Sequence, residues 1–209
     1  MSSYRLSVRA AGRAEMLIYG DIGSGWVEDG VTASRVAADL KAVGKVSTLD
    51  VRINSYGGDV FEGLAIYRQI ANFDASVNVF VDGVAASAAS IIAMAGNKIE
   101  IAQAGFLMIH DAWTFAAGNA DELRATAERL DATSEAMASI YSARTKKSST
   151  QCRDLMRVET WMTAQEAVDN GFADSIAPNM AIAAKADPKR FAFRNLPTVL
   201  GPRRHAAVS

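Results

Sequence analysis

The sequence predicts an α/β domain built around a largely parallel sheet, and three observations support this class. Short apolar runs typical of strands alternate with segments whose apolar residues recur at helical spacing. Glycine-rich turns separate several of these strands from the helices that follow them. The chain has 209 residues, of which 50% are hydrophobic, so one domain with a substantial core is expected.

The first half of the chain predicts three strands, each followed by a helix. The expected elements are, in order, a strand at 15–20, a helix at 31–43, a strand at 49–53, a helix at 60–73, a strand at 77–81 and a helix at 86–95.

The second half predicts two short strands and two helices. The strands are expected at 99–101 and 106–109, and a long amphipathic helix at 121–145 has Asn119 as its N-cap. A short helix at 163–170 carries Thr163 and Glu166 at capping-box spacing and ends at Gly171.

Composition excludes several classes of protein. The net charge is −1, and the longest apolar stretch, about 85–95, is too short to span a bilayer. No apolar leader is visible at the N-terminus, and the single cysteine, Cys152, excludes an intramolecular disulfide. With only two histidines in the chain, a metal site is not expected. We therefore expect a cytoplasmic protein without a membrane partner, a cofactor or a metal.

The C-terminal end, residues 179–209, is predicted to be a basic tail that follows the domain at 1–178. Residues 185–209 carry a net charge of +5, and three of the four prolines lie beyond 178. We expect a solvated, partly disordered segment rather than one that binds nucleic acid. The alternative is that its apolar residues dock on a neighbouring subunit; these are Phe191, Phe193, Leu196 and Leu200.

A glycine turn follows the second predicted strand, in the sequence INSYGGDVFEG at 53–63. Glycines there let backbone N–H groups point into a site, where they could bind a phosphate or stabilise an oxyanion. The spacing is neither that of a dinucleotide fingerprint nor that of a Walker A loop. A purely structural turn fits the pattern equally well.

Ser87 and His110 are the candidate nucleophile and base. Ser87 lies in a small-residue segment, GVAASAAS, which is equally typical of a closely packed helix. His110 ends the apolar run FLMIH, and the only other histidine, His205, lies in the tail. Glu159 could orient the imidazole, whereas Asp111 is a poor partner because adjacent strand residues point to opposite faces.

These motifs together resemble the Clp protease proteolytic subunit family. NSYGG, GVAASAAS, LMIHDAW and ETWMTAQEAVDNGFADSI occur in the family's order and at its separations, from about Ala14 to Ile176. Three motifs are most similar to the phage and prophage branch, the Clp-like head maturation proteases: IYGDIG, INSYGGDVFEGLAIY and AASAAS.

The resemblance implies a Clp/crotonase-like fold of repeated β-β-α-type units, with a protruding handle at about 114–145. It implies Ser87 as nucleophile, His110 as general base and Glu159 at the place of the family's aspartate. The oxyanion hole would consist of the backbone N–H groups of Gly58, or alternatively Gly57, and of Ala88. Tyr56 departs from the family, which usually has proline there.

The function implied by the resemblance is that of a serine endopeptidase acting on polypeptides, with phage capsid or scaffold proteins as the expected substrates. We expect a homo-oligomer of stacked heptameric rings, in which residues 114–119 form a strand that pairs across rings. Three rival functions remain: a housekeeping subunit served by an ATPase, a crotonase-like acyl-CoA enzyme and a non-catalytic assembly module. The need for an ATPase partner is left open.

Overall fold

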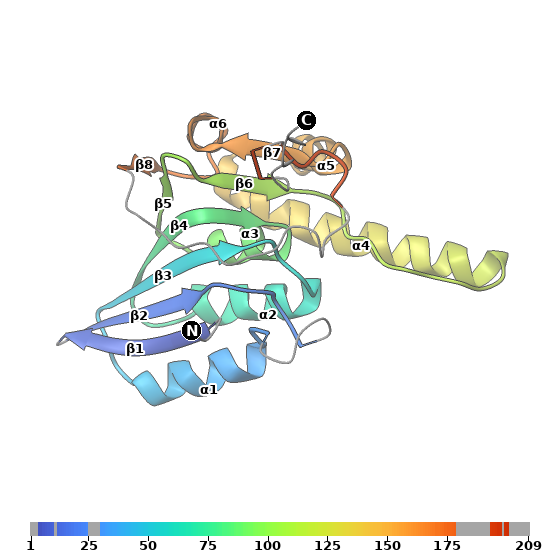
Figure 1. The fold of residues 1–209 in the computed structure, drawn as a ribbon. Helices are drawn as coiled ribbons and strands as arrows, with labels where there is room; N and C mark the ends of the chain where they lie inside the picture. Colours follow the sequence, from blue (N-terminus) through green and yellow to red (C-terminus); the bar gives the residue numbers. More distant parts are fainter. Residues whose placement is uncertain (1–3, 11, 25–29, 179–192, 198, 201–209) are drawn as a thin grey trace, which may run out of the picture.

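The computed structural model describes residues 4–10, 12–24, 30–178, 193–197 and 199–200. Their centre is an eight-stranded sheet with the strand order β1-β2-β3-β4-β5-β8, to which β6 and β7 are added beside β4. Figure 1 shows the strands stacked across the molecule. The strands are β1 Tyr4–Ala10, β2 Arg13–Ile18, β3 Thr48–Ser55, β4 Ser76–Ala86, β5 Lys98–Ala102, β6 Phe106–Ile109, β7 Thr160–Thr163 and β8 Ser175–Ala177.

The sheet is mostly parallel. Strands β2, β3, β4, β5 and β8 run in one direction, and β1 is antiparallel to β2 at one edge. Strand β4 is long enough to have two neighbours on the same side: its first half pairs with β5 and its second half with β6, both parallel. Strand β7 then pairs antiparallel with β6. This arrangement confirms the predicted α/β class.

Six helices of the described residues join the strands and cover the sheet. They are α1 Ala33–Val43, α2 Val60–Ala71, α3 Ala88–Ala93, α4 Ala120–Thr145, α5 Ser149–Arg157 and α6 Ala164–Asp169. One continuous apolar core unites strands and helices, and Ile53, Val79, Ile66, Ile91 and Met137 all belong to it. Burial of such side chains is the main stabilising contribution to the fold.

Helix α4 projects from the body of the molecule (Figure 1). Asn119 caps it and forms a capping box with Glu122, which confirms the predicted start. Its buried residues, Ser134, Met137, Ala138 and Tyr141, all lie in the C-terminal half, which packs on the core. The N-terminal half therefore contributes little to the core of a single chain, and Leu123 there is 43% exposed.

Four elements were missed by sequence reasoning: β1, α5, β7 and β8. Helix α5 is short and polar, and strands of three or four residues carry too little periodicity to be recognised. Strand β4 extends five residues past its predicted end, so α3 begins two residues later than expected. Residues 114–119 form no strand in the single chain.

Candidate active site

A strained turn between β4 and α3 presents Ser87. Its φ of 53° and ψ of −127° are unusual for a residue with a side chain. The Ser87 N–H donates to the carbonyl of Met108 at 3.0 Å, which fixes the turn against β6. The Ser87 side chain is half-buried, whereas Ser90, one turn further along, is fully buried. The turn thus makes one serine accessible at the start of a helix.

His110 reaches Ser87 because β4 and β6 are parallel neighbours. Ala86 lies opposite Met108 in the register, so both strands end at the same edge of the sheet. His110 Nε2 lies 2.8 Å from Ser87 Oγ. With a proton on Nδ1, the neutral imidazole can accept the hydroxyl proton through Nε2.

The imidazole of His110 is buried, with 7% of the residue exposed. The pKa of His110 is lowered from 6.5 to about 4, mainly by burial; the nearby Glu159 carboxylate acts to raise the pKa, and the charge of Arg194 acts to lower it. The histidine is therefore neutral near pH 7, which is the form a general base requires.

Two glycines bring the turn before α2 against the Ser87 turn. Gly57 and Gly58 have φ values of 102° and 143°, which side-chain-bearing residues rarely adopt. A Cβ at Gly57 would lie 2.8 Å from the Cβ of Ser87 and 3.0 Å from the N of Ala88, so only glycine permits this approach. The turn therefore runs directly beside Ser87.

The two glycine N–H groups differ in what they bind. The Gly57 N–H donates to Ser55 Oγ at 3.1 Å. No hydrogen bond among the described residues engages the Gly58 N–H, and Gly58 lines the pocket next to Ser87. Ala88 is the first residue of α3, where an N–H has no partner within the helix. The sequence left Gly57 and Gly58 open as donors to an oxyanion, and the geometry favours the N–H of Gly58.

Glu159 lies between α5 and β7 with a φ of 52° and is 3% exposed. Its carboxylate accepts hydrogen bonds from the backbone N–H of Arg194 at 2.8 Å and of Asn195 at 2.6 Å. The indole N–H of Trp161 donates to it at 3.2 Å. Within the described part of the chain, no hydrogen bond joins Glu159 to His110. The glutamate is close enough to influence the imidazole, but it is bonded elsewhere.

The contacts of residues 193–195 correct our expectation for the tail. We expected a solvated segment, or one docked on a neighbouring subunit, but Phe193 packs on its own chain. Its ring centroid lies 5.2 Å from that of Trp161 and 6.2 Å from that of His110. The other residues assigned to the tail at 179–192, 198 and 201–209 lie outside the described residues. The apolar residues of the basic tail were the only signal for this contact.

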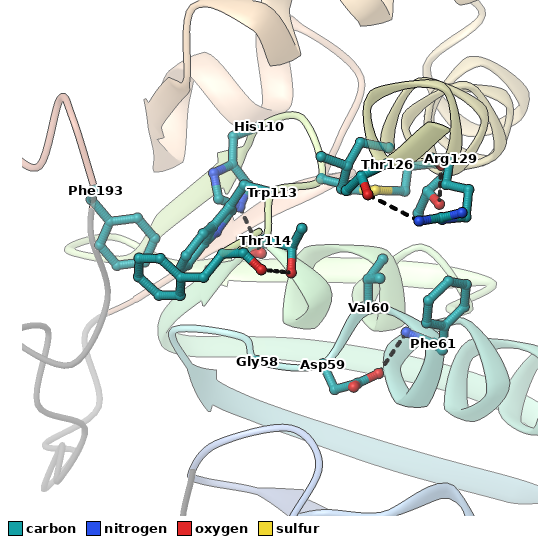
Figure 2. A pocket seen from close by; sticks show the side chains of 16 residues that line it. Gly58, Asp59, Val60, Phe61, His110, Trp113, Thr114, Thr126, Arg129 and Phe193 are labelled. Carbon is teal, nitrogen blue, oxygen red and sulfur yellow. Dashed lines mark hydrogen bonds between the residues drawn. The ribbon is translucent and has the colours of Figure 1, made fainter. Parts of the chain in front are cut away.

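A pocket of about 360 Å³ opens beside Ser87 and His110. Figure 2 shows Phe193 at one side of it and Val60 and Phe61 at the opposite side, with His110 and Trp113 between them. Most of its lining is apolar, and α4 contributes Thr126, Arg129, Leu130, Thr133 and Met137. The pocket can hold an extended peptide with apolar side chains next to Ser87 and His110.

Asp111 is engaged by an arginine that sequence reasoning missed. Arg153 of α5 is buried, and its Nη1 lies 2.6 Å from a carboxylate oxygen of Asp111. The same guanidinium contacts Asp131 at 3.1 Å and Glu135 at 3.8 Å, both on α4. Arg153 therefore ties the residue after His110 to the projecting helix.

The described residues offer neither a metal centre nor a membrane-spanning helix. No cluster of three or more histidine, cysteine, aspartate or glutamate side chains there could hold a metal ion. None of the helices in the same ranges is long and apolar enough to cross a membrane.

Comparison with known proteins identifies the family. The family model for Clp protease matches residues 15–180. The ATP-dependent Clp protease proteolytic subunit of Ligilactobacillus salivarius is 33% identical over 75% of this chain and 81% of its own. That of Streptococcus agalactiae is 31% identical, again over 75% of this chain and 83% of its own.

A solved structure supports the same assignment. A mutant of ClpP1 from Listeria monocytogenes superimposes with a TM-score of 0.66 and 25% identity, covering 80% of this chain and 92% of the other. The expected closeness to the phage branch is not confirmed, since the relatives named here are Clp protease proteolytic subunits. The fold and the matched residues together establish that this chain belongs to the Clp protease family and is a serine-type endopeptidase.

Proposed function

We propose that Ser87 is the nucleophile of this protease and His110 its general base. The observation that supports this most is the 2.8 Å distance between Ser87 Oγ and His110 Nε2, at a turn that exposes the hydroxyl. His110 takes the hydroxyl proton while Ser87 Oγ bonds to the peptide carbonyl carbon. The C–N bond then breaks and His110 gives the proton to the leaving amine. In the second half of the reaction, water attacks the acyl carbonyl carbon while His110 takes its proton. The bond to Ser87 Oγ then breaks, and His110 returns the proton to that oxygen.

The oxyanion formed in each step would be bound by the N–H groups of Gly58 and Ala88. Gly58 lines the pocket and its N–H is uncommitted among the described residues, while Ala88 begins a helix whose N-terminal dipole favours negative charge. Loss of one such donor typically costs about 10²–10³ in rate.

The substrate is a polypeptide, and the pocket favours an apolar side chain next to the cleaved bond. Val60, Phe61, Leu130 and Met137 line it and would bury such a side chain. The names of the relatives favour an ATP-dependent proteolytic subunit that degrades proteins delivered by an ATPase. Head maturation, in which a capsid or scaffold protein is the substrate, is the competing function, and it rests on the similarity of sequence motifs alone.

A homo-oligomer of stacked rings is proposed as the working form. Helix α4 projects from the body, and large apolar side chains are exposed around its N-terminal half and the pocket mouth; these are Phe61, Trp113, Phe115 and Leu123. Exposed apolar patches of this kind mark interaction surfaces. Rings that meet through α4 would bury it and enclose the Ser87 sites.

Treatment with a fluorophosphonate, followed by mass spectrometry, tests the catalytic assignment. One adduct at Ser87 is expected, and His110→Ala should prevent it. An assembled chain without any adduct would support a non-catalytic assembly module instead. Addition of an ATPase of the Clp type with a folded substrate then separates the two proteolytic functions. ATP-dependent degradation is expected of an ATP-dependent proteolytic subunit and not of a head maturation protease.

A further inference from the structure

Residues 193–195, which we name the strap, bind the carboxylate that the family motif places beside the catalytic histidine. The backbone N–H of Arg194 donates to one carboxylate oxygen of Glu159 at 2.8 Å, and that of Asn195 donates to the other at 2.6 Å. Hydrogen bonds to an ionised acceptor are among the strongest in proteins. Both oxygens of Glu159 are therefore engaged by one short segment.

Side chains of the strap hold it in place on either side of these bonds. The Asn195 amide donates to the carbonyl of Val158 at 2.7 Å, and the Arg194 guanidinium donates to that of Arg157 at 3.2 Å. Phe193 packs edge-on against Trp161, with an interplanar angle of 88°. The strap is thus attached to the residues that precede and follow Glu159.

This attachment has a consequence for His110. A triad acid works by accepting the Nδ1–H of the imidazole, which fixes its tautomer and stabilises the imidazolium that forms. Among the described residues, the Glu159 carboxylate accepts only from the strap and from Trp161. Arg194 also brings a positive charge towards His110 and so opposes its protonation. The bound strap withholds the stabilising acid and adds an unfavourable charge.

On the basis of the function proposed above, we propose that the strap is an autoinhibitory element, which keeps Glu159 away from His110 until it is displaced. Displacement frees the carboxylate to accept the Nδ1–H. Phe193 lies at one side of the pocket beside His110 (Figure 2), so a peptide that fills that side competes with its ring. Substrate binding can therefore remove the strap.

The experiment compares the full-length wild-type chain with the double variant Phe193→Ala/Asn195→Ala. The substitutions remove the ring contacts of Phe193 and the hydrogen bond from the Asn195 side-chain amide to the carbonyl of Val158. They leave Ser87, His110 and Glu159 unchanged. The matched control is Val199→Ala, which lies a few residues beyond the strap and is 74% exposed. The readouts are the rate of fluorophosphonate labelling of Ser87 and the pKa of His110 measured by NMR.

Because the chain has two histidines, His110 is assigned simply by comparison with His205→Ala. We expect the double variant to label at least about tenfold faster, since a correctly placed triad acid contributes several powers of ten. The His110 pKa should rise towards its usual value in the variant. The control should match the wild type in both readouts.

An equal or slower rate with an intact fold would overturn the proposal, because the strap would then brace Glu159 rather than withhold it. If the double variant does not fold, Asn195→Ala alone decides: a smaller acceleration supports inhibition, and no acceleration refutes it. Failure of the catalytic assignment looks different, since Ser87 would then remain unlabelled in all variants.

Discussion

The hydroxyl of Ser90 lies 2.8 Å from that of Tyr141 and donates to the carbonyl of Ser87 at 2.7 Å. Ser90 and Tyr141 are both fully buried, so the hydroxyl of Ser90 serves to pack α3 against α4. Ser55 is likewise buried and accepts from the Gly57 N–H. Of the serines beside the glycine turn and α3, only Ser87 combines exposure with a neighbouring base.

Fluorophosphonate should therefore modify Ser87 alone. Ser87→Ala should abolish peptide cleavage and leave the fold intact, because alanine already occupies positions 86 and 88. Ser90→Ala serves as control: it loses two hydrogen bonds, each of which typically contributes about 1 kcal/mol, but keeps labelling at Ser87. Peptide mapping of the adduct checks this, and an adduct on Ser90 or Ser55 contradicts it.

His110→Ala should lose nearly as much activity as Ser87→Ala, because residues that act as one catalytic unit each cost nearly the full activity when removed. Glu159→Gln should cost less than either, since loss of the triad acid typically costs less than loss of the nucleophile or the base. Steady-state turnover of a short fluorogenic peptide measures all three. A loss in Glu159→Gln as large as in His110→Ala would show that Glu159 acts on the imidazole directly.

The pH dependence of kcat/KM should have its acidic limb near pH 4 rather than near 6.5. His110 must be neutral to accept a proton, and burial lowers its pKa to about 4, so activity is lost as pH falls through that value. The charged groups that act on the imidazole are Glu159, which raises the pKa, and Arg194, which lowers it. Arg194→Gln should move the limb upwards, and an unchanged profile would exclude that influence.

Native mass spectrometry at micromolar concentration should find a tetradecamer. Leu123→Asp places a charge on the exposed half of α4, where Leu123 is 43% exposed, and should weaken assembly without unfolding the chain. Glu128→Gln, also exposed on α4, is the matched control and should assemble normally. A wild type that remains monomeric or dimeric would contradict the ring.

Arg153→Met should destabilise the fold by about 2 kcal/mol, as expected when a charged hydrogen bond to a partly buried carboxylate is lost. Asp111 would lose its partner at 2.6 Å, next to His110, so activity should fall as well. Arg157→Met is the control, because its pair with Asp154 is exposed and contributes little. Thermal unfolding of the two variants provides the comparison.

The sequence by itself was sufficient for the fold class and for most elements with strong periodicity. Asn119 and Thr163 cap their helices as predicted, because capping depends on residues only three positions apart. The scarcity of histidine and the order of the motifs also pointed to Ser87 and His110, which the structure brings within 2.8 Å of each other.

Only the tertiary structure decided which groups meet. The 2.8 Å contact of Ser87 with His110 follows from the parallel register of β4 and β6, and the hydroxyl of Ser55 engages the N–H of Gly57. The binding of Glu159 by residues 193–195 joins positions about 35 residues apart through backbone N–H groups. Every residue except proline carries such a donor, so no pattern of side chains marks where it binds.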